Sequence, residues 1–248
     1  MEKVLIVTGG SRGIGAATAL LAAKQGYAVC VNYLRNQAAA QAVVNTIEEG
    51  GMPAIAVAAD VASEDDVNHL FRAVDRQLGR VTALVNNASI LEQQMRVEKM
   101  DTTRLSRIFA TNVIGSFLCA REAIKRMSTK QGGSGGAIVN VSSVASRLGA
   151  PGEYIDYAAS KGAIDSMTIG LSKEVADEGI RVNAVRPGFI YTDIHASGGE
   201  PNRVERVKHL LPMKRGGQAS EVANAILWLL SDAASYTTGS FIEVAGGK

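Results

Sequence analysis

Short apolar runs alternate along the chain with longer segments in which apolar residues recur every three or four positions. The short runs are almost continuously apolar, which is typical of parallel strands covered on both faces. They predict seven strands: Val4–Thr8, Ala28–Tyr33, Ala54–Ala58, Ala83–Asn86, Ala137–Val141, Arg181–Val185 and Phe241–Val244. Because strands and helical segments alternate, we expect right-handed βαβ units in a doubly wound, seven-stranded parallel sheet with helices on both faces, an α/β fold.

The longer segments carry the apolar stripes of amphipathic helices. Ser63, followed by three acidic residues, predicts the N-cap of one of them. The clearest stripes are Val67/Leu70/Phe71/Val74/Leu78 and Val222/Ala225/Ile226/Leu229/Leu230. Residues 190–217 form the one long segment without strong periodicity, and they follow a strand end, where α/β sheets bind ligands. We therefore expect a substrate lid at 190–217 and, since no interdomain linker is evident, a single domain over 1–248.

Composition and charge exclude several classes of protein. Lysine and arginine number 26 against 24 acidic residues, so the net charge of +2 gives no general attraction to nucleic acid or to a membrane surface. No apolar run approaches the roughly 18 residues of a membrane span, and no basic leader precedes the first predicted strand. Cys30 and Cys119 lie in apolar surroundings and are expected to be buried and reduced. These observations favour a cytoplasmic protein.

A glycine-rich turn separates the first predicted strand from the first predicted helix. It reads Thr8-Gly-Gly-Ser-Arg-Gly-Ile-Gly15 and accounts for part of a glycine content of 26 residues. Glycine lets the backbone turn sharply and approach a pyrophosphate, whose charge a helix N-terminus favours. The glycine spacing is not that of the general dinucleotide fingerprint. A tight strand-to-helix turn without a ligand is the alternative, and the position of the turn at the first such junction favours a dinucleotide.

The choice of dinucleotide depends on the charges near the adenosine ribose. An acidic residue about twenty positions after the turn would bind a ribose 2′-hydroxyl and indicate NAD. No Asp or Glu occurs between Lys3 and Glu48, whereas Arg12 and Arg35 both lie near the expected ribose. A 2′-phosphate would attract these guanidinium groups, although they could also be solvated surface groups. The pattern favours NADP(H) and leaves NAD(H) possible.

Tyr157 and Lys161 begin a predicted helix at a spacing of four residues. This spacing places both side chains on one face, with Cβ atoms about 5–6 Å apart. A nearby ammonium favours the phenolate and is expected to lower the tyrosine pKa from its usual value of about 10. A general acid or base for a carbonyl or an alcohol needs such a group. An isolated tyrosine and lysine at this spacing are more often exposed surface residues without a role in catalysis. The interpretation therefore depends on the motifs that accompany the pair.

Several motifs accompany this pair in a fixed order along the chain. They are Thr8–Gly15, Asn86-Asn87-Ala88, Asn112, Ser143, Tyr157 with Lys161, and Pro187–Thr192. Together they resemble the motifs of the short-chain dehydrogenase/reductase family, and the resemblance extends from Lys3 to Gly247. It is strongest to the single-domain branch that includes 3-oxoacyl-carrier-protein reductases and glucose 1-dehydrogenases. The resemblance implies a Rossmann fold and hydride transfer between a nicotinamide and a carbonyl or alcohol, with no metal needed.

The resemblance also implies a role for each matching residue. Tyr157 would be the general acid/base, and Lys161 would hold the ribose and lower the tyrosine pKa. Ser143 would orient the substrate carbonyl, and Asn112 would anchor a water in a proton relay through Lys161. Cofactor contacts would come from the glycine-rich turn, from the ends of the next three strands and from the segment after the sixth. These residues are Gly9, Ser11, Arg12, Gly13, Ile14, Gly15, Asn32, Tyr33, Arg35, Asp60, Val61, Asn87, Ala88, Pro187, Gly188, Ile190 and Thr192.

Two features depart from the family pattern. Ser89 stands where the family usually has glycine, so the backbone there is expected to be less free or the cofactor slightly displaced. The interval from Ser143 to Tyr157 is one residue longer than usual, which leaves Ser142 as a second candidate for the substrate-orienting hydroxyl. We favour Ser143 because it is nearer the usual interval.

The expected function is an NADP(H)-dependent carbonyl reductase or alcohol dehydrogenase acting on a small molecule. An NAD(P)-dependent sugar dehydrogenase is the alternative within the class, and a non-catalytic dinucleotide sensor is the alternative outside it. The resemblance further implies a homotetramer that pairs helices over about 104–127 and 157–177. Met95, Leu148, Tyr154, Ile190 and His195 are weaker candidates for the pocket wall. Four basic residues of the lid could meet an acidic carrier protein, although a solvated helix face is favoured: Arg203, Arg206, Lys208 and His209.

Overall fold

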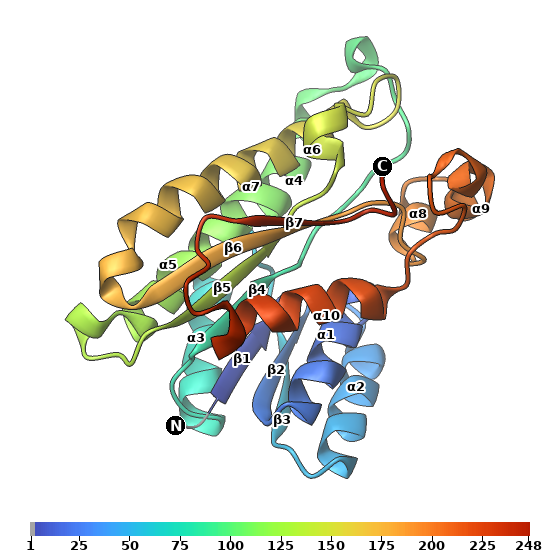
Figure 1. Cartoon of the computed structure of the whole chain (residues 1–248). Coiled ribbons are helices and arrows are strands. Elements are labelled where there is room, and N and C mark those ends of the chain that lie inside the picture. The colour runs from blue at the N-terminus through green and yellow to red at the C-terminus, as the bar shows by residue number, and fades with distance from the viewer. Residues whose placement is uncertain (1–2) are drawn as a thin grey trace.

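Seven parallel strands form one sheet in the order β3-β2-β1-β4-β5-β6-β7 (Figure 1). The computed structural model describes residues 3–248. The strands are β1 Lys3–Val7, β2 Tyr27–Tyr33, β3 Ala54–Ala58, β4 Ala83–Asn86, β5 Gly136–Val141, β6 Ile180–Pro187 and β7 Phe241–Val244. All seven predicted strands are confirmed, and their bounds differ from the prediction by at most two residues, which is the ordinary uncertainty of a strand end.

Helices cover both faces of the sheet, as the doubly wound interpretation requires. One face carries α1 (Gly13–Lys24), α2 (Gln37–Glu49) and α10 (Ala219–Leu230). The other carries α3 (Glu64–Gln77), α5 (Gly115–Met127) and α7 (Ile155–Glu174). The remaining helical elements are η1 Val97–Lys99, α4 Thr102–Phe109, η2 Ala110–Ile114, η3 Thr129–Gln131, α6 Ala145–Leu148, η4 Ala176–Glu178, α8 Ile194–Ser197, α9 Arg203–Val207, η5 Lys208–Leu210 and η6 Asp232–Ala234.

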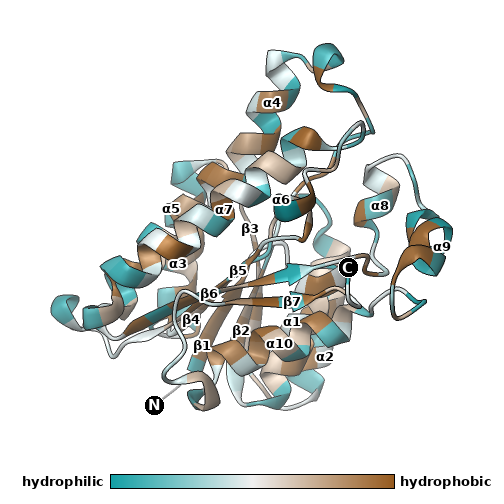
Figure 2. Cartoon of the chain, turned by 45° about the horizontal axis from the view of Figure 1, so that its top comes forward, coloured by the Kyte–Doolittle hydropathy of each residue, from teal (hydrophilic) through white to brown (hydrophobic). Residues whose placement is uncertain are grey.

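Side chains of successive strand residues enter two separate hydrophobic cores. In β1, Leu5 and Val7 pack in the core below α1 and α10, whereas Val4 and Ile6 pack in the core below α3 and α5. This alternation follows from the two-residue period of a strand, and it explains why the strand sequences are apolar throughout. Figure 2 shows the hydrophobic central strands lying between the two helical layers.

The strand order reverses between β1 and β4. From β1 the chain proceeds outward to β3, and it then crosses to β4 on the other side of β1. In sheets of this kind, ligands bind beyond the carboxyl ends of the strands at this reversal. The glycine-rich turn follows β1 and the Asn87-Ala88-Ser89 segment follows β4, so the fold brings these two segments together.

The segment 190–217 contains two short helices, α8 and α9, and its two ends are held together. Ile190 and Gly217 form a parallel bridge, and the backbone nitrogen of Tyr191 donates to the carbonyl of Gly217 at 2.9 Å. Both cysteines are buried and unpaired, as predicted. Within residues 3–248, no helix has the length and apolar character needed to cross a membrane.

Candidate active site

A cavity of about 810 Å³ runs along the carboxyl ends of β1 to β6. Its wall includes the glycine-rich turn at one end and Ser143, Tyr157 and Lys161 farther along. Among the catalytic and cofactor-binding residues predicted from the sequence, all but Gly15 and Asn112 line it. The chain thus brings segments from Gly9 to Thr192 into one continuous site.

The conformation of the glycine-rich turn requires glycine at three positions. Gly9 and Gly13 have φ angles of +61° and +56°, which side chains rarely allow. A Cβ on Gly15 would lie 2.4 Å from the carbonyl oxygen of Gly9 and 2.6 Å from the Asn87 amide nitrogen. Gly15 therefore stands behind the cavity wall, where it allows α1 to approach the turn closely enough to aim its N-terminus into the cavity.

Polar side chains behind the turn fix its position. The amide oxygen of Asn32 accepts from the backbone nitrogen of Gly9 at 3.2 Å, and its amide nitrogen donates to the carbonyl of Ala59 at 3.0 Å. Asn87 donates to the carbonyl of Thr8 at 2.8 Å. The side chains of Asn32 and Asn87 therefore hydrogen-bond to the backbone of the glycine-rich turn and stabilise this part of the cavity wall.

The two arginines predicted near the ribose lie at the rim of the cavity. Arg12 and Arg35 are both exposed, and both line it beside Ser11 and Tyr33. Neither guanidinium forms an ion pair within residues 3–248. Two guanidinium groups without an ion-pair partner in the described part of the chain thus line the cavity together with the carboxylate of Asp60, and they can attract an anion.

Tyr157 and Lys161 share one face of α7, as predicted from their spacing. The Lys161 ammonium donates a hydrogen bond of 2.8 Å to the carbonyl of Val141 and lies 5.4 Å from the centre of the Tyr157 ring. Burial lowers the pKa of Lys161 to about 8, and the nearby carboxylate of Asp165 opposes that change. The ammonium is thus held beside the tyrosine with little contact with solvent.

The expected lowering of the tyrosine pKa is wrong. Burial raises the pKa of Tyr157 to about 12, and the neighbouring hydroxyls of Ser143 and Ser89 act in the opposite direction. The physical reason is that desolvation penalises the phenolate more than these neighbouring hydroxyls stabilise it. Lys161 directs its ammonium to a backbone carbonyl, and its charge does not reverse the balance. In the free protein, Tyr157 is consequently a protonated phenol at neutral pH.

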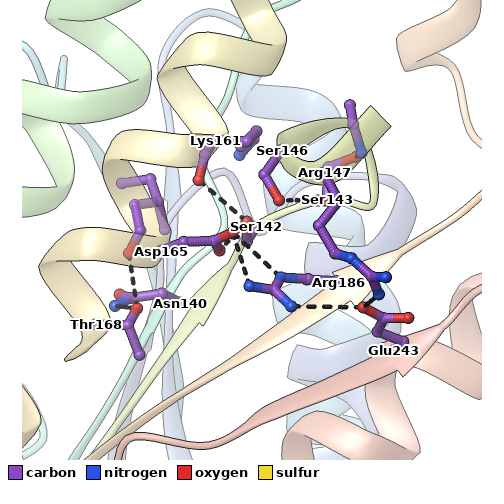
Figure 3. A network of polar contacts seen from close by, with 12 residues as sticks. Asn140, Ser142, Ser143, Ser146, Arg147, Lys161, Asp165, Thr168, Arg186 and Glu243 are labelled. Carbon is purple, nitrogen blue, oxygen red and sulfur yellow. Dashed lines mark hydrogen bonds and ion pairs between the residues drawn. The ribbon is translucent and has the colours of Figure 1, made fainter. Parts of the chain in front are cut away.

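The two serines that follow β5, Ser142 and Ser143, have different surroundings (Figure 3). The Ser142 hydroxyl donates to the carboxylate of Asp165 at 2.6 Å, and the same carboxylate accepts from Arg186 at 3.0 Å. Ser143 faces Tyr157, and its oxygen accepts from the backbone nitrogen of Ala145 at 3.1 Å. Sequence reasoning did not identify Asp165. Its position four residues after Lys161, on the same face of the helix, was the available signal.

Asn112 lies in a π-helical turn, η2, between α4 and α5, and is 1% exposed. Its amide nitrogen donates to the hydroxyl of Ser160 at 3.1 Å, and its amide oxygen accepts from the backbone nitrogen of Ile90 at 2.8 Å. Ser160 in turn donates to the carbonyl of Tyr157 at 2.7 Å. Asn112 therefore links the segment after β4 to the first turn of α7. No motif or spacing in the sequence indicated Ser160.

The segment 190–217 forms part of the wall. Ile190 and His195 line the cavity with Leu148 and Tyr154, as predicted, but Met95 does not. Three of the four basic residues predicted to meet a carrier protein are paired with acids of the same chain: Arg203 with Glu153 and Glu200, Arg206 with Glu200, and Lys208 with Glu205, whereas His209 forms no ion pair within residues 3–248. These pairs leave little free positive charge there for an acidic partner.

Residues 9–248 match a family model described as enoyl-(acyl carrier protein) reductase. A solved short-chain type dehydrogenase/reductase from Mycobacterium marinum superposes with a TM-score of 0.92 at 33% identity, over 99% of this chain and 94% of that one. The chain belongs to the short-chain dehydrogenase/reductase family. It is therefore an oxidoreductase acting on CH–OH or C=O groups of a small molecule, in a family that binds NAD(P)(H).

Individual members of the short-chain dehydrogenase/reductase family match along almost the whole chain. The uncharacterized oxidoreductase YgfF of Escherichia coli (strain K12) is 64% identical over 245 residues, which is 99% of each chain. The 3-oxoacyl-[acyl-carrier-protein] reductase FabG of Staphylococcus aureus (strain Mu50 / ATCC 700699) is 38% identical over all of this chain and 98% of that protein. The acetoin dehydrogenase YohF of Salmonella typhimurium superposes with a TM-score of 0.87 at 35% identity, over 100% and 97% of the two chains.

Proposed function

We propose that this enzyme is an NADP(H)-dependent reductase of carbonyl compounds, with Tyr157 as its general acid. The observation that carries the proposal is that Tyr157, Ser143 and Lys161 line the same cavity as the glycine-rich turn, with the Lys161 ammonium 5.4 Å from the centre of the Tyr157 ring. Burial raises the pKa of this phenol to about 12, so it holds its proton at neutral pH and is placed to exchange it with a substrate oxygen. A relative named as a reductase supports reduction as the working direction.

The residues of the cavity fit a dinucleotide. A Cβ on Gly13 would lie 3.2 Å from the methyl group of Thr192, so the glycine-rich turn and the segment after β6 approach each other closely at the cavity wall. The N-terminus of α1 and the unpaired Arg12 and Arg35 would hold phosphate groups, including a 2′-phosphate. Tyr33, Asp60, Val61, Ala88, Pro187, Gly188 and Ile190 would line the remaining length. When bound, the nicotinamide supplies the hydride.

Side chains of this protein would carry out the proton transfer. Ser143 donates a hydrogen bond to the substrate carbonyl oxygen and so holds it next to the Tyr157 hydroxyl. Tyr157 then transfers its proton to that oxygen as the carbonyl carbon gains a hydride, and the product is an alcohol. Lys161 would bind the ribose and stabilise the resulting phenolate by its charge. Asn112 would support a proton relay from Lys161 through a bound water.

The substrate end of the cavity favours a carbonyl on an apolar chain. Much of the lining is apolar: Leu91, Val144, Leu148, Tyr154, Phe189, Ile190 and Ile194 stand beside the polar Glu153, Asp193, His195 and Arg203. Hydroxyl groups of a polyhydroxylated sugar that face the apolar residues would stay unpaired, at a cost of about 1–3 kcal/mol each. Relatives named as 3-oxoacyl reductase and acetoin dehydrogenase support the same class. The segment 190–217 would act as the lid over this end.

We also infer a single domain that assembles as a homotetramer through the helices of the α4–α5 and α7 regions. Large apolar side chains are exposed along α4, η2 and α5: Leu105, Phe109, Ile114 and Phe117. Exposed apolar groups of this size are typical of an interface between copies. Sedimentation that yields only monomer would contradict this assembly.

The test is a substrate panel followed by nicotinamide absorbance. The carbonyl substrates are ethyl acetoacetate and diacetyl, each assayed with NADPH and with NADH. Their alcohols and glucose are assayed with NADP+ and with NAD+. We expect oxidation of NADPH with a carbonyl compound, faster than oxidation of NADH. Tyr157→Phe should bind NADPH as the parent does and lose turnover by about a hundredfold or more.

Two results would overturn the proposal. Turnover retained by Tyr157→Phe would remove the tyrosine from the mechanism. Dinucleotide binding without turnover of any panel member would instead support a sensor.

A further inference from the structure

Ser89 carries a buried hydroxyl that has no hydrogen-bond partner within residues 3–248. The residue follows β4 and lines the cavity together with Tyr157. Its backbone neighbours are fixed on both sides, because Ala88 donates to Thr8 at 3.0 Å and Ile90 donates to Asn112 at 2.8 Å. The Ser89 hydroxyl is therefore held in place without being satisfied by the surrounding protein.

An unpaired buried hydroxyl costs about 1–3 kcal/mol unless a ligand or a reacting group uses it. The group next to the Ser89 hydroxyl is the phenol of Tyr157, on which Ser143 also acts. Ser143 accepts from the backbone nitrogen of Ala145, which leaves its own hydrogen free to donate. Two serine hydroxyls from the ends of β4 and β5 thus converge on one phenol oxygen.

The demand for hydrogen bonds at this oxygen changes during the reaction. While Tyr157 is protonated, its oxygen is a weak acceptor. When the proton has moved to the substrate oxygen, the phenolate is a strong acceptor in a site from which water is largely excluded. Ser143 is by then engaged with the substrate oxygen, so a second donor is needed at the tyrosine itself.

We propose that Ser89 is a further catalytic residue, whose hydroxyl donates a hydrogen bond to the Tyr157 oxygen as the tyrosine gives up its proton. Ser89 keeps its own proton throughout. The transferred proton passes from the Tyr157 oxygen to the substrate oxygen, and the carbon gains a hydride from the reduced nicotinamide. This inference rests on the proposed function, in which Tyr157 is the general acid.

The test compares three substitutions at this position in the holoenzyme. Ser89→Ala removes the hydroxyl and keeps the Cβ, Ser89→Thr keeps the hydroxyl, and Ser89→Gly restores the residue usual in the family. The measured quantity is kcat against pH for the reduction of the best carbonyl of the ethyl acetoacetate, diacetyl and glucose panel, and for the oxidation of its alcohol. Binding of NADPH by fluorescence and the thermal midpoint are recorded for each variant.

We expect Ser89→Ala and Ser89→Gly to lower kcat for oxidation at neutral pH about tenfold, because oxidation starts from the phenolate that Ser89 stabilises. In both variants, the pH below which kcat for oxidation declines should rise by about one unit. Ser89→Thr should retain the parent profile. The thermal midpoint of Ser89→Ala should not fall, since the lost hydroxyl has no protein partner to leave unpaired. NADPH binding should change by less than about twofold.

If kcat depends on pH in Ser89→Ala as it does in the parent, the inference is overturned. A lower thermal midpoint of Ser89→Ala without a shift of the acidic limb of its kcat profile would overturn it too. The Tyr157→Phe variant separates this failure from failure of the proposed function. Loss of turnover in Tyr157→Phe together with an unchanged Ser89→Ala profile refutes only the role of Ser89. Retained turnover in Tyr157→Phe refutes both.

Discussion

The ammonium of Lys161 is held by a 2.8 Å hydrogen bond to the carbonyl of Val141, the last residue of β5. This contact places a cation beside Tyr157 in a buried site, where retaining the charge is unfavourable. The pKa of Lys161 is accordingly lowered to about 8, whereas that of Tyr157 is raised to about 12. The two groups therefore lose their protons in the order lysine, then tyrosine.

The rate of carbonyl reduction should consequently fall as the pH rises through about 8. The lysine carries its charge below its folded pKa and loses it above, while the tyrosine stays protonated over the same range. The measurement is kcat/KM for carbonyl reduction against pH. In Lys161→Arg, whose guanidinium stays charged, any remaining activity should lack this limb, and Lys161→Met should be weak at every pH. A limb that persists in Lys161→Arg would assign it to another group.

A second prediction concerns the dinucleotide. Arg35→Ala should weaken NADPH binding about tenfold and leave NADH binding nearly unchanged, because the guanidinium would meet only the 2′-phosphate. Arg12→Ala should act in the same direction. Arg76→Ala, an exposed change on α3, is the matched control and should affect neither dinucleotide. Equal dissociation constants for NADPH and NADH in the parent would contradict the preference for NADP(H).

Ser142 and Ser143 should respond differently to the same substitution. Ser143→Ala should lower kcat by about a hundredfold, since it removes a donor to the reacting oxygen. Ser142→Ala removes a 2.6 Å hydrogen bond to Asp165, which retains Arg186 as a partner. It should therefore lower the free energy of unfolding by about 1–3 kcal/mol and change kcat much less. Comparable losses of kcat in the two variants would refute this division.

The loop between Ser143 and Tyr157 contains a residue other than glycine in the left-handed backbone region. Ala150 has a φ angle of +44°, next to Gly149 at +74°. Ala150→Gly should raise the free energy of unfolding by up to about 1 kcal/mol, because glycine accepts this conformation. Ala42→Gly, on the exposed side of α2, should lower it by about 1 kcal/mol. Urea unfolding of both variants measures the contrast, and changes of the same sign would argue against strain at Ala150.

The sheet and most of the cavity wall could be predicted from the sequence because their signals are local. A strand buried on both faces, such as residues 83–85 of β4, is apolar throughout, and Gly9 and Gly13 mark a turn with positive φ. Asn112 could be singled out, but its π-helical turn could not, since that conformation follows from tertiary packing. The pKa of Tyr157 could not be predicted from the sequence either, because it depends on how completely distant segments exclude water from the phenol.

A buried ion pair fixes the start of the helix that carries Tyr157. The guanidinium of Arg104 donates to the carboxylate of Asp156 at 2.7 Å, with side-chain exposures of 6% and 0%. Asp156 also accepts from the backbone nitrogen of Tyr157 at 2.9 Å. Asp156→Ala leaves the arginine buried without its partner and should lower the free energy of unfolding by about 3–5 kcal/mol.

The exposed pair of Arg107 and Glu92, 2.9 Å apart, provides the control. Glu92→Ala should cost less than about 1 kcal/mol because solvent screens that pair. Replacing both buried partners, as Arg104→Met with Asp156→Leu, should cost less than Asp156→Ala alone, since no unpaired charge remains. Urea unfolding measures all three variants. If Asp156→Ala costs no more than Glu92→Ala, the buried pair does not hold the first turn of α7, and the position of Tyr157 must depend on Ser160 and Asn112 instead.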